Sequence, residues 1–155
     1  MGDGLVGEAR LRVRYAETDQ MGVVYHANYL VWFEVGRVEL MREMGFEYKR
    51  METEDDCHIA VVEASARYRW PARYDDEIVV RTRLTTMRGF LLKFSYEVLR
   101  EADGKLLCEG ETTHIVCDSE MHKKTLPGKY AERFRVFGSL AQRNGARTRG
   151  RLREE

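Results

Sequence analysis

The first regular pattern in the chain is an alternation of apolar and charged residues near its N-terminus. Leu11, Val13 and Tyr15 alternate with arginines at positions 10, 12 and 14. A period of two is typical of a strand that buries one face and exposes the other. We therefore expect a strand that continues to about Tyr15.

A second pattern predicts a long helix over residues 30–44. The segment has no proline, and Gly45 after it readily adopts the left-handed conformation that ends helices. Apolar residues occupy most of the helix circumference, which predicts a helix covered by other structure. Gly36 in mid-helix costs about 1 kcal/mol relative to alanine, which predicts a close backbone approach. Four apolar residues share one side at helical spacing: Leu30, Phe33, Met41 and Met44.

Four stretches after Gly45 are dense in β-branched and aromatic residues, as is typical of strands. Two hairpin signals, Arg88-Gly89 and Asp103-Gly104, separate some of them, and short turns make neighbouring strands antiparallel. One strand, a long helix and four antiparallel strands predict an α+β domain whose sheet curls around the helix. A second short helix is expected over residues 127–137. The four strands are expected at approximately 59–69, 78–86, 91–99 and 106–117.

Length and charge indicate one domain followed by a separate tail. A chain of 155 residues has the usual size of one domain, which we expect to cover residues 1–137. Residues 138–155 contain five arginines and few apolar residues, so we expect a basic, mobile tail. The tail has no aromatic residues that could stack on bases, which argues against a nucleic-acid partner.

Composition also indicates where the protein resides. The apolar runs are far shorter than the roughly 20 residues that cross a bilayer, and the first residues lack a signal-peptide pattern. Cys57, Cys108 and Cys117 match no disulfide or zinc spacing. We expect a soluble, cytoplasmic protein with no membrane span and with reduced, buried cysteines.

The candidate chemistry is concentrated in residues 15–29, which read YAETDQMGVVYHANY. Asp19 precedes His26 by seven residues, in the segment that joins the expected strand to the expected helix. A carboxylate beside the positive end of a helix dipole is a compact arrangement for attacking a carbonyl. Asp19 could instead cap its own turn. The neighbouring Glu17 is expected to be solvated or salt-bridged rather than part of an acid pair.

Other catalytic chemistries lack sequence signals. The four histidines are scattered and form no HExxH motif or close His/Cys cluster, so we expect no metal. No GxSxG motif is present, and the cysteines lie in or beside expected buried strands, which argues against serine or cysteine nucleophiles.

The run YAETDQMGVVYHANYLVWFEVGR, with PARYDDEI and TTMRG after it, resembles the 4-hydroxybenzoyl-CoA thioesterase branch of the hotdog-fold superfamily. The resemblance covers about residues 9–136 and is strongest to the YbgC-like acyl-CoA thioesterases. It implies a five-stranded antiparallel sheet wrapped around one long central helix. It also implies homodimers joined edge to edge, with active sites between subunits, and dimers that pair into tetramers. The first motif combines fixed positions: Asp19, Gly22, Val24, Tyr25, His26, Asn28, Tyr29, Phe33, Glu34 and Arg37.

The resemblance also implies a reaction, in which acyl-CoA and water give a carboxylic acid and free coenzyme A. Asp19 takes the position of the catalytic carboxylate, which acts as a general base on water or as a nucleophile that forms an anhydride. His26 takes the helix-start position whose backbone N–H meets the thioester oxygen. No cofactor is implied beyond the coenzyme A of the substrate. Three further residues are candidate substrate contacts or helix-capping and packing residues: Tyr25, Asn28 and Tyr29.

Three charged residues have an open role. Arg88 falls where the family contacts the phosphates of coenzyme A, and it could equally be a solvated hairpin charge. Glu34 and Arg37 are three residues apart and are expected to pair within the helix or across a subunit boundary. For Asn28 we favour a structural hydrogen bond. A non-catalytic acyl-thioester binding or scaffold protein of the same fold, and a hotdog hydratase, are the alternative functions.

Overall fold

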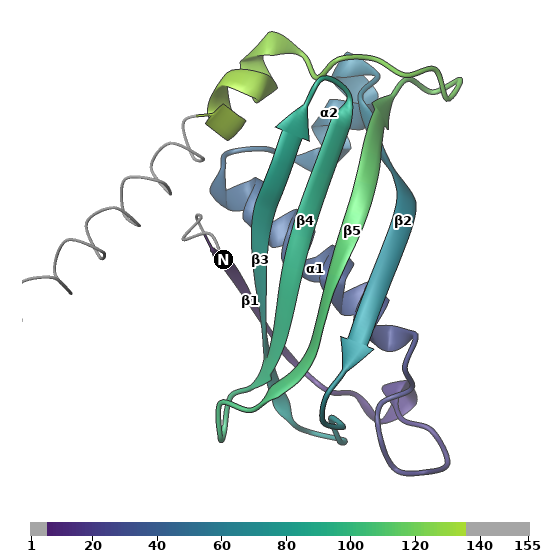
Figure 1. Cartoon of the computed structure of the whole chain (residues 1–155), viewed down its shortest axis with the longest axis vertical. Coiled ribbons are helices and arrows are strands. Elements are labelled where there is room, and N and C mark those ends of the chain that lie inside the picture. Colours follow the sequence, from purple (N-terminus) through teal and green to yellow (C-terminus); the bar gives the residue numbers. More distant parts are fainter. Residues whose placement is uncertain (1–5, 136–155) are drawn as a thin grey trace, which may run out of the picture.

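Five antiparallel strands form one sheet in the computed structural model, which describes residues 6–135 (Figure 1). The order across the sheet is β1-β3-β4-β5-β2, so β1 and β2 are its two edges. The expected tail, residues 138–155, lies outside the described residues. The strands are β1 Gly7–Arg12, β2 His58–Tyr68, β3 Glu77–Arg88, β4 Leu91–Arg100 and β5 Leu106–Cys117.

One long helix, α1 (Asn28–Glu43), lies across one face of this sheet (Figure 1). Its bounds match the helix expected from the apolar pattern, and residues 128–135 form the second expected helix. The helix α2 (Tyr48–Asp55) was not predicted. Met51 is the one buried residue of α2, so its apolar pattern is too weak to detect in the sequence.

The sheet-facing side of α1 forms the centre of the core. Trp32 and Phe33 are buried there, and the Phe33 ring stacks on Tyr96 of β4 with 4.4 Å between centroids. The expectation that other structure covers the helix on most sides is wrong for the single chain. Leu30, one of the four apolar residues expected to share a side of the helix, is 41% exposed, and Val31 is 50% exposed. One apolar side of α1 is therefore open.

Gly36 brings α1 close to the sheet, as its position in mid-helix predicted. A Cβ atom at Gly36 would lie 2.4 Å from the Thr82 hydroxyl oxygen and 2.7 Å from a methyl group of Val80. Both neighbours belong to β3 and are fully buried. A side chain at this position would push α1 away from β3.

The first strand ends earlier than expected. Val13 continues the buried face with 1% exposure, but β1 ends at Arg12 and Tyr15 is 78% exposed. The chain turns at Tyr15–Glu17 into a short 3-10 helix, which rotates the Tyr15 side chain away from the core. The buried face therefore stops at Val13.

The three cysteines are free and buried, as expected. Burial raises the pKa of the Cys108 thiol to about 12, which keeps it protonated and unreactive at neutral pH. Among the helices of residues 6–135, none combines the length and apolar character needed to cross a bilayer.

A buried polar chain runs beneath α1 and ends at His114. Arg37 donates to the Tyr96 hydroxyl at 3.0 Å, and that hydroxyl lies 2.6 Å from the Thr112 hydroxyl. The Thr112 oxygen lies 2.7 Å from His114 Nε2, whereas His114 Nδ1 is buried without a partner among the described residues. Burial, with the nearby charge of Arg37, lowers the pKa of His114 to about 4.

We expect this histidine to make folding stability depend on pH. The unfolded chain binds a proton at an ordinary histidine pKa of 6.5, and the folded chain only near 4, so stability falls as the pH is lowered through this window. Between roughly pH 7.5 and pH 5 the wild type should lose about 2 kcal/mol that His114→Gln does not lose. Urea denaturation of both proteins at both pH values measures the difference. Equal losses in the two proteins would contradict it.

Candidate active site

The loop between Tyr15–Glu17 and α1 folds into a tight turn that carries Asp19. Thr18 pairs with Val24 in an antiparallel bridge, so the two arms of the loop lie side by side. The Gly22 N–H donates to the Asp19 carbonyl at 3.0 Å, and Gly22 has φ of 75°. Glycine is favoured here because the backbone conformation is left-handed.

The Asp19 carboxylate is half-buried and has one oxygen engaged. Oδ1 accepts the Met21 N–H at 2.8 Å, which is the turn-capping role that the sequence left open. Among residues 6–135, Oδ2 has no hydrogen-bonding partner. Asp19 therefore caps its own turn and keeps a second carboxylate oxygen available.

The start of α1 presents free backbone donors at His26. The helix begins at Asn28 without a side-chain cap, and the N–H groups of His26 and Ala27 have no acceptor within the described part of the chain. Unpaired N–H groups at a helix start attract an incoming negative or partly negative oxygen. The His26 carbonyl accepts the Tyr68 hydroxyl at 2.9 Å, which fixes the helix start to the end of β2.

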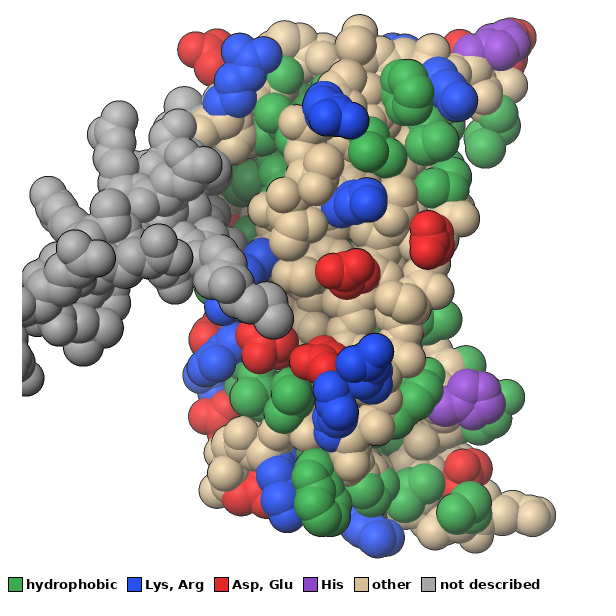
Figure 2. Space-filling view, in the orientation of Figure 1, with side chains coloured by type: hydrophobic (Ala, Val, Ile, Leu, Met, Phe, Trp, Pro, Cys, Tyr) green, Lys and Arg blue, Asp and Glu red, His purple; other side chains and the backbone are tan. Residues whose placement is uncertain are grey.

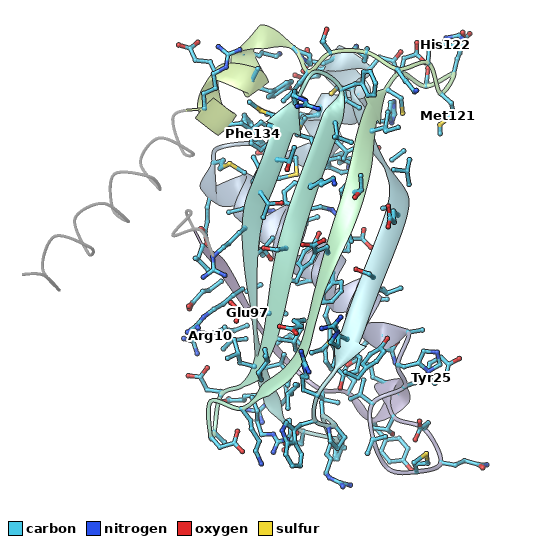
Figure 3. All side chains as sticks on the ribbon, viewed as in Figure 1. Arg10, Tyr25, Glu97, Met121, His122 and Phe134 are labelled. Atoms are coloured by element: carbon cyan, nitrogen blue, oxygen red, sulfur yellow. The ribbon has the colours of Figure 1, made fainter. Side chains whose placement is uncertain are left out.

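The other candidates around this helix start differ in accessibility. Tyr25, labelled in Figure 3, is 46% exposed. The centroid of its ring lies 4.4 Å from that of the His26 ring. Asn28 donates its side-chain amide to the Glu17 carbonyl at 2.9 Å, which confirms the structural hydrogen bond that we favoured. Tyr29 is buried, and its hydroxyl accepts the Ala72 N–H at 3.2 Å. Burial raises the pKa of Tyr29. Substrate contact by these residues stays a prediction.

Glu17 forms the salt bridge that was one of its two expected roles, but the sequence did not predict its burial. Its expected ion pair forms, with Arg14 Nε at 3.4 Å, but the side chain is buried rather than solvated. Its second oxygen accepts the indole N–H of Trp32 at 2.8 Å. Trp32 is fifteen residues further along the chain, so no local pattern could reveal this contact.

Arg88 lies at the opposite end of the sheet from Asp19. It is the last residue of β3, in the hairpin that leads into β4. The Asp19 loop lies at the opposite end of the sheet, near the C-terminal end of β2 (Figure 1). Strands rise about 3.3 Å per residue, so the length of β3 separates the two ends by about 40 Å. A single chain therefore does not bring Arg88 and Asp19 together.

The open side of α1 and the edge strand β2 lie beside the Asp19 loop. Val61 and Val62 on β2 are 52% and 54% exposed, and β2 has no partner beyond β5 among the described strands.

Within residues 6–135, Arg37 forms no ion pair with Glu34. On the sheet face turned away from α1, charged side chains are scattered over the strands (Figure 2).

A cavity of about 210 Å³ lies elsewhere, between α2 and residues 128–135. None of the candidate site residues contributes to it. In the described residues, no group of three His, Cys, Asp or Glu side chains is placed to hold a metal ion. The cavity is lined by Gly45, Phe46, Glu47, Arg50, Glu54, Lys129, Tyr130 and Arg133.

Comparison with known families identifies the fold and the class of protein. The sequence model of the thioesterase-like superfamily matches residues 13–134. The chain belongs to this superfamily. The expected α+β hotdog fold and the expected class of thioester hydrolase are thereby confirmed.

Several known proteins are similar to this chain over most of its length. The putative acyl-CoA thioesterase YneP of Bacillus subtilis is 42% identical over 118 residues, which are 76% of this chain and 84% of YneP. The acyl-CoA thioester hydrolase YbgC of Escherichia coli is 33% identical over 126 residues, 81% of this chain and 92% of YbgC. A crystal structure of a hypothetical protein from Thermus thermophilus has a TM-score of 0.79 and 38% identity, covering 84% of this chain and 98% of that protein.

Proposed function

We propose that this thioesterase hydrolyses acyl-CoA to a carboxylic acid and free coenzyme A at the Asp19 loop. The observation that carries the proposal is that one loop holds both a carboxylate oxygen of Asp19 without a hydrogen-bonding partner and, at the start of α1, backbone N–H groups without an acceptor among the described residues. Asp19 lies in the turn that the Thr18–Val24 bridge closes, and His26 and Ala27 follow Val24 by two and three residues. The names of the relatives YneP and YbgC support acyl-CoA as the substrate.

The proposed chemistry follows from charge development on the thioester. The carbonyl oxygen gains negative charge as the carbonyl carbon is attacked, and the His26 N–H with the helix dipole stabilises that charge. Asp19 either removes a proton from the attacking water or attacks the carbon itself. In both routes the carbon–sulfur bond breaks and coenzyme A leaves as the thiol. In the second route water hydrolyses the anhydride and regenerates the carboxylate.

We propose further that a second copy of the chain completes the site. Support comes from the unpaired edge of β2 and from the open apolar side of α1 beside it. An exposed edge strand is a template for pairing with another strand. Antiparallel pairing of two β2 strands turns the partner end for end, so Arg88 of the partner subunit comes to the end that carries Asp19. Pairing of such dimers into tetramers stays a prediction.

Complementation between two inactive or weakened variants tests this shared site. Arg88→Ala should raise KM for acyl-CoA by about tenfold, since a cation near phosphate is lost. Asp19→Asn homodimers should be nearly inactive. A dimer containing one chain of each variant holds one intact site, so co-expression in equal amounts should restore about a quarter of wild-type activity at low substrate. Activity equal to the sum of the separate homodimers would contradict the shared site.

Release of free thiol from a panel of acyl-CoAs tests the proposed reaction. A thioesterase should turn over at least one chain length many times per active site, with the panel also defining the preferred acyl group. Binding of acyl-CoA without turnover of any member would favour the alternative, a non-catalytic acyl-thioester binding protein.

A further inference from the structure

We propose that Glu17 is a positioning residue that holds the Asp19 loop against the start of α1, an inference that rests on the proposed function of that loop. Glu17 is 6% exposed, although it carries a carboxylate. A buried carboxylate is costly unless hydrogen bonds replace its water. All of its hydrogen bonds go to segments that flank the loop.

The carboxylate joins the strand side of the loop to the helix side. Oε1 accepts the Arg14 backbone N–H at 2.8 Å, and Arg14 follows β1 closely. Oε2 accepts the indole N–H of Trp32 at 2.8 Å, and Trp32 lies in the second turn of α1 with 2% exposure. The two oxygens of one side chain therefore fix the distance between the end of β1 and α1.

The backbone carbonyl of Glu17 closes the loop at the same point. It accepts the Tyr25 N–H at 2.9 Å and the side-chain amide of Asn28 at 2.9 Å. Tyr25 is adjacent to His26, and Asp19 follows Glu17 by two residues. A displacement of Glu17 therefore moves the Asp19 carboxylate relative to the His26 N–H.

Such a displacement affects catalysis more than substrate binding. Misplacement of a reacting group by about 1 Å can reduce a rate by about a hundredfold, because attack requires close approach and alignment. Binding contacts tolerate small displacements better than bond formation does, so KM should change less than kcat. Hydrogen bonds constrain direction as well as distance, which apolar packing at position 17 would not do.

Glu17→Gln is the direct test. The amide keeps one oxygen for the Arg14 N–H but turns an NH₂ donor toward the Trp32 N–H, so the link to α1 is lost. We expect kcat to fall by about 10- to 100-fold and KM to stay within about threefold of the wild type. The double variant Glu17→Gln/Trp32→Phe removes the opposing donor and should be no slower than Glu17→Gln alone.

A matched control separates positioning from general destabilisation. Phe134→Leu changes a buried residue at the far end of the molecule from Tyr25 (Figure 3). It should lower the free energy of unfolding and leave kcat unchanged. If Glu17→Gln lowers stability and likewise leaves kcat unchanged, Glu17 has a structural role only and the proposal is overturned.

A second measurement does not depend on turnover. Amide hydrogen exchange reports directly on the Tyr25 N–H, which donates to the Glu17 carbonyl, and Glu17→Gln should accelerate exchange there and at the neighbouring hydrogen-bonded N–H groups of Val24 and Asn28. If the wild type hydrolyses no acyl-CoA, the proposed function fails, and exchange alone then decides whether Glu17 holds the loop. Unchanged exchange in that case overturns the inference.

Discussion

Replacing Asp19 by Asn is expected to lower kcat for acyl-CoA hydrolysis by about two to four orders of magnitude. Asparagine has the same shape and keeps an oxygen that accepts the Met21 N–H, so the turn should survive. It cannot take a proton from water or attack a carbonyl as a carboxylate does. Thiol release gives kcat, and urea denaturation should show a change in unfolding free energy below about 0.5 kcal/mol.

Asp118→Asn is the matched control for this substitution. Asp118 Oδ1 also caps a turn, because it accepts the Glu120 and His122 N–H groups at 2.9 Å each. That turn lies at the end of the sheet away from Asp19, beside His122 (Figure 3). The control should keep wild-type turnover. If Asp19→Asn also keeps turnover within about threefold, Asp19 is a turn cap and not the catalytic carboxylate.

Gly110→Ala is expected to lower the free energy of unfolding by about 3 kcal/mol. A Cβ atom at Gly110 would lie 2.3 Å from the backbone carbonyl oxygen of Ser65 and 2.6 Å from the Phe33 ring. The Ser65 carbonyl belongs to the neighbouring strand β2 and cannot rotate away. Phe33 is fully buried and stacked on Tyr96, so it has no room to move.

Gly128→Ala provides the comparison for Gly110. A Cβ atom there would meet nothing within 4 Å, and residue 128 is the first residue of a helix. Its effect should be neutral or stabilising by up to about 1 kcal/mol, because alanine favours the helix and restricts the unfolded chain. Denaturation midpoints of both variants measure the contrast. Similar stabilities for the two would show that α1 does not depend on close approach at Gly110.

Patterns that depend on neighbouring residues were sufficient for most of the fold. The approximate bounds of α1 followed from the apolar run before Gly45, and β5 (Leu106–Cys117) from its β-branched and other apolar residues. Asp103-Gly104 placed the hairpin before β5, where Gly104 has φ of 68°. These features were predictable because turn preference and side-chain period are local properties of the backbone.

The same local character explains how much of the site could be predicted. The motif around Asp19 and His26 placed both at a strand-to-helix turn, and the structure has them on the loop that leads into α1. It left turn capping by Asp19 open and did not predict that Asp19 would cap its turn while retaining a free oxygen. That outcome depends on the conformation at Gly22 and on the Thr18–Val24 bridge.

By itself the sequence determined the number and approximate positions of the strands, the helix α1, the loop that carries the candidate carboxylate and the resemblance to thioesterases. Tertiary structure alone decided that Glu17 is buried against Trp32, that Leu30 stays exposed, and that Arg88 lies at the far end of the sheet. The physical reason is that burial and desolvation depend on which distant segments meet. The spacing of residues along the chain sets the side-chain period of each element and the positions of the turns. Tertiary packing decides which charged groups lose their water and which apolar surfaces remain exposed.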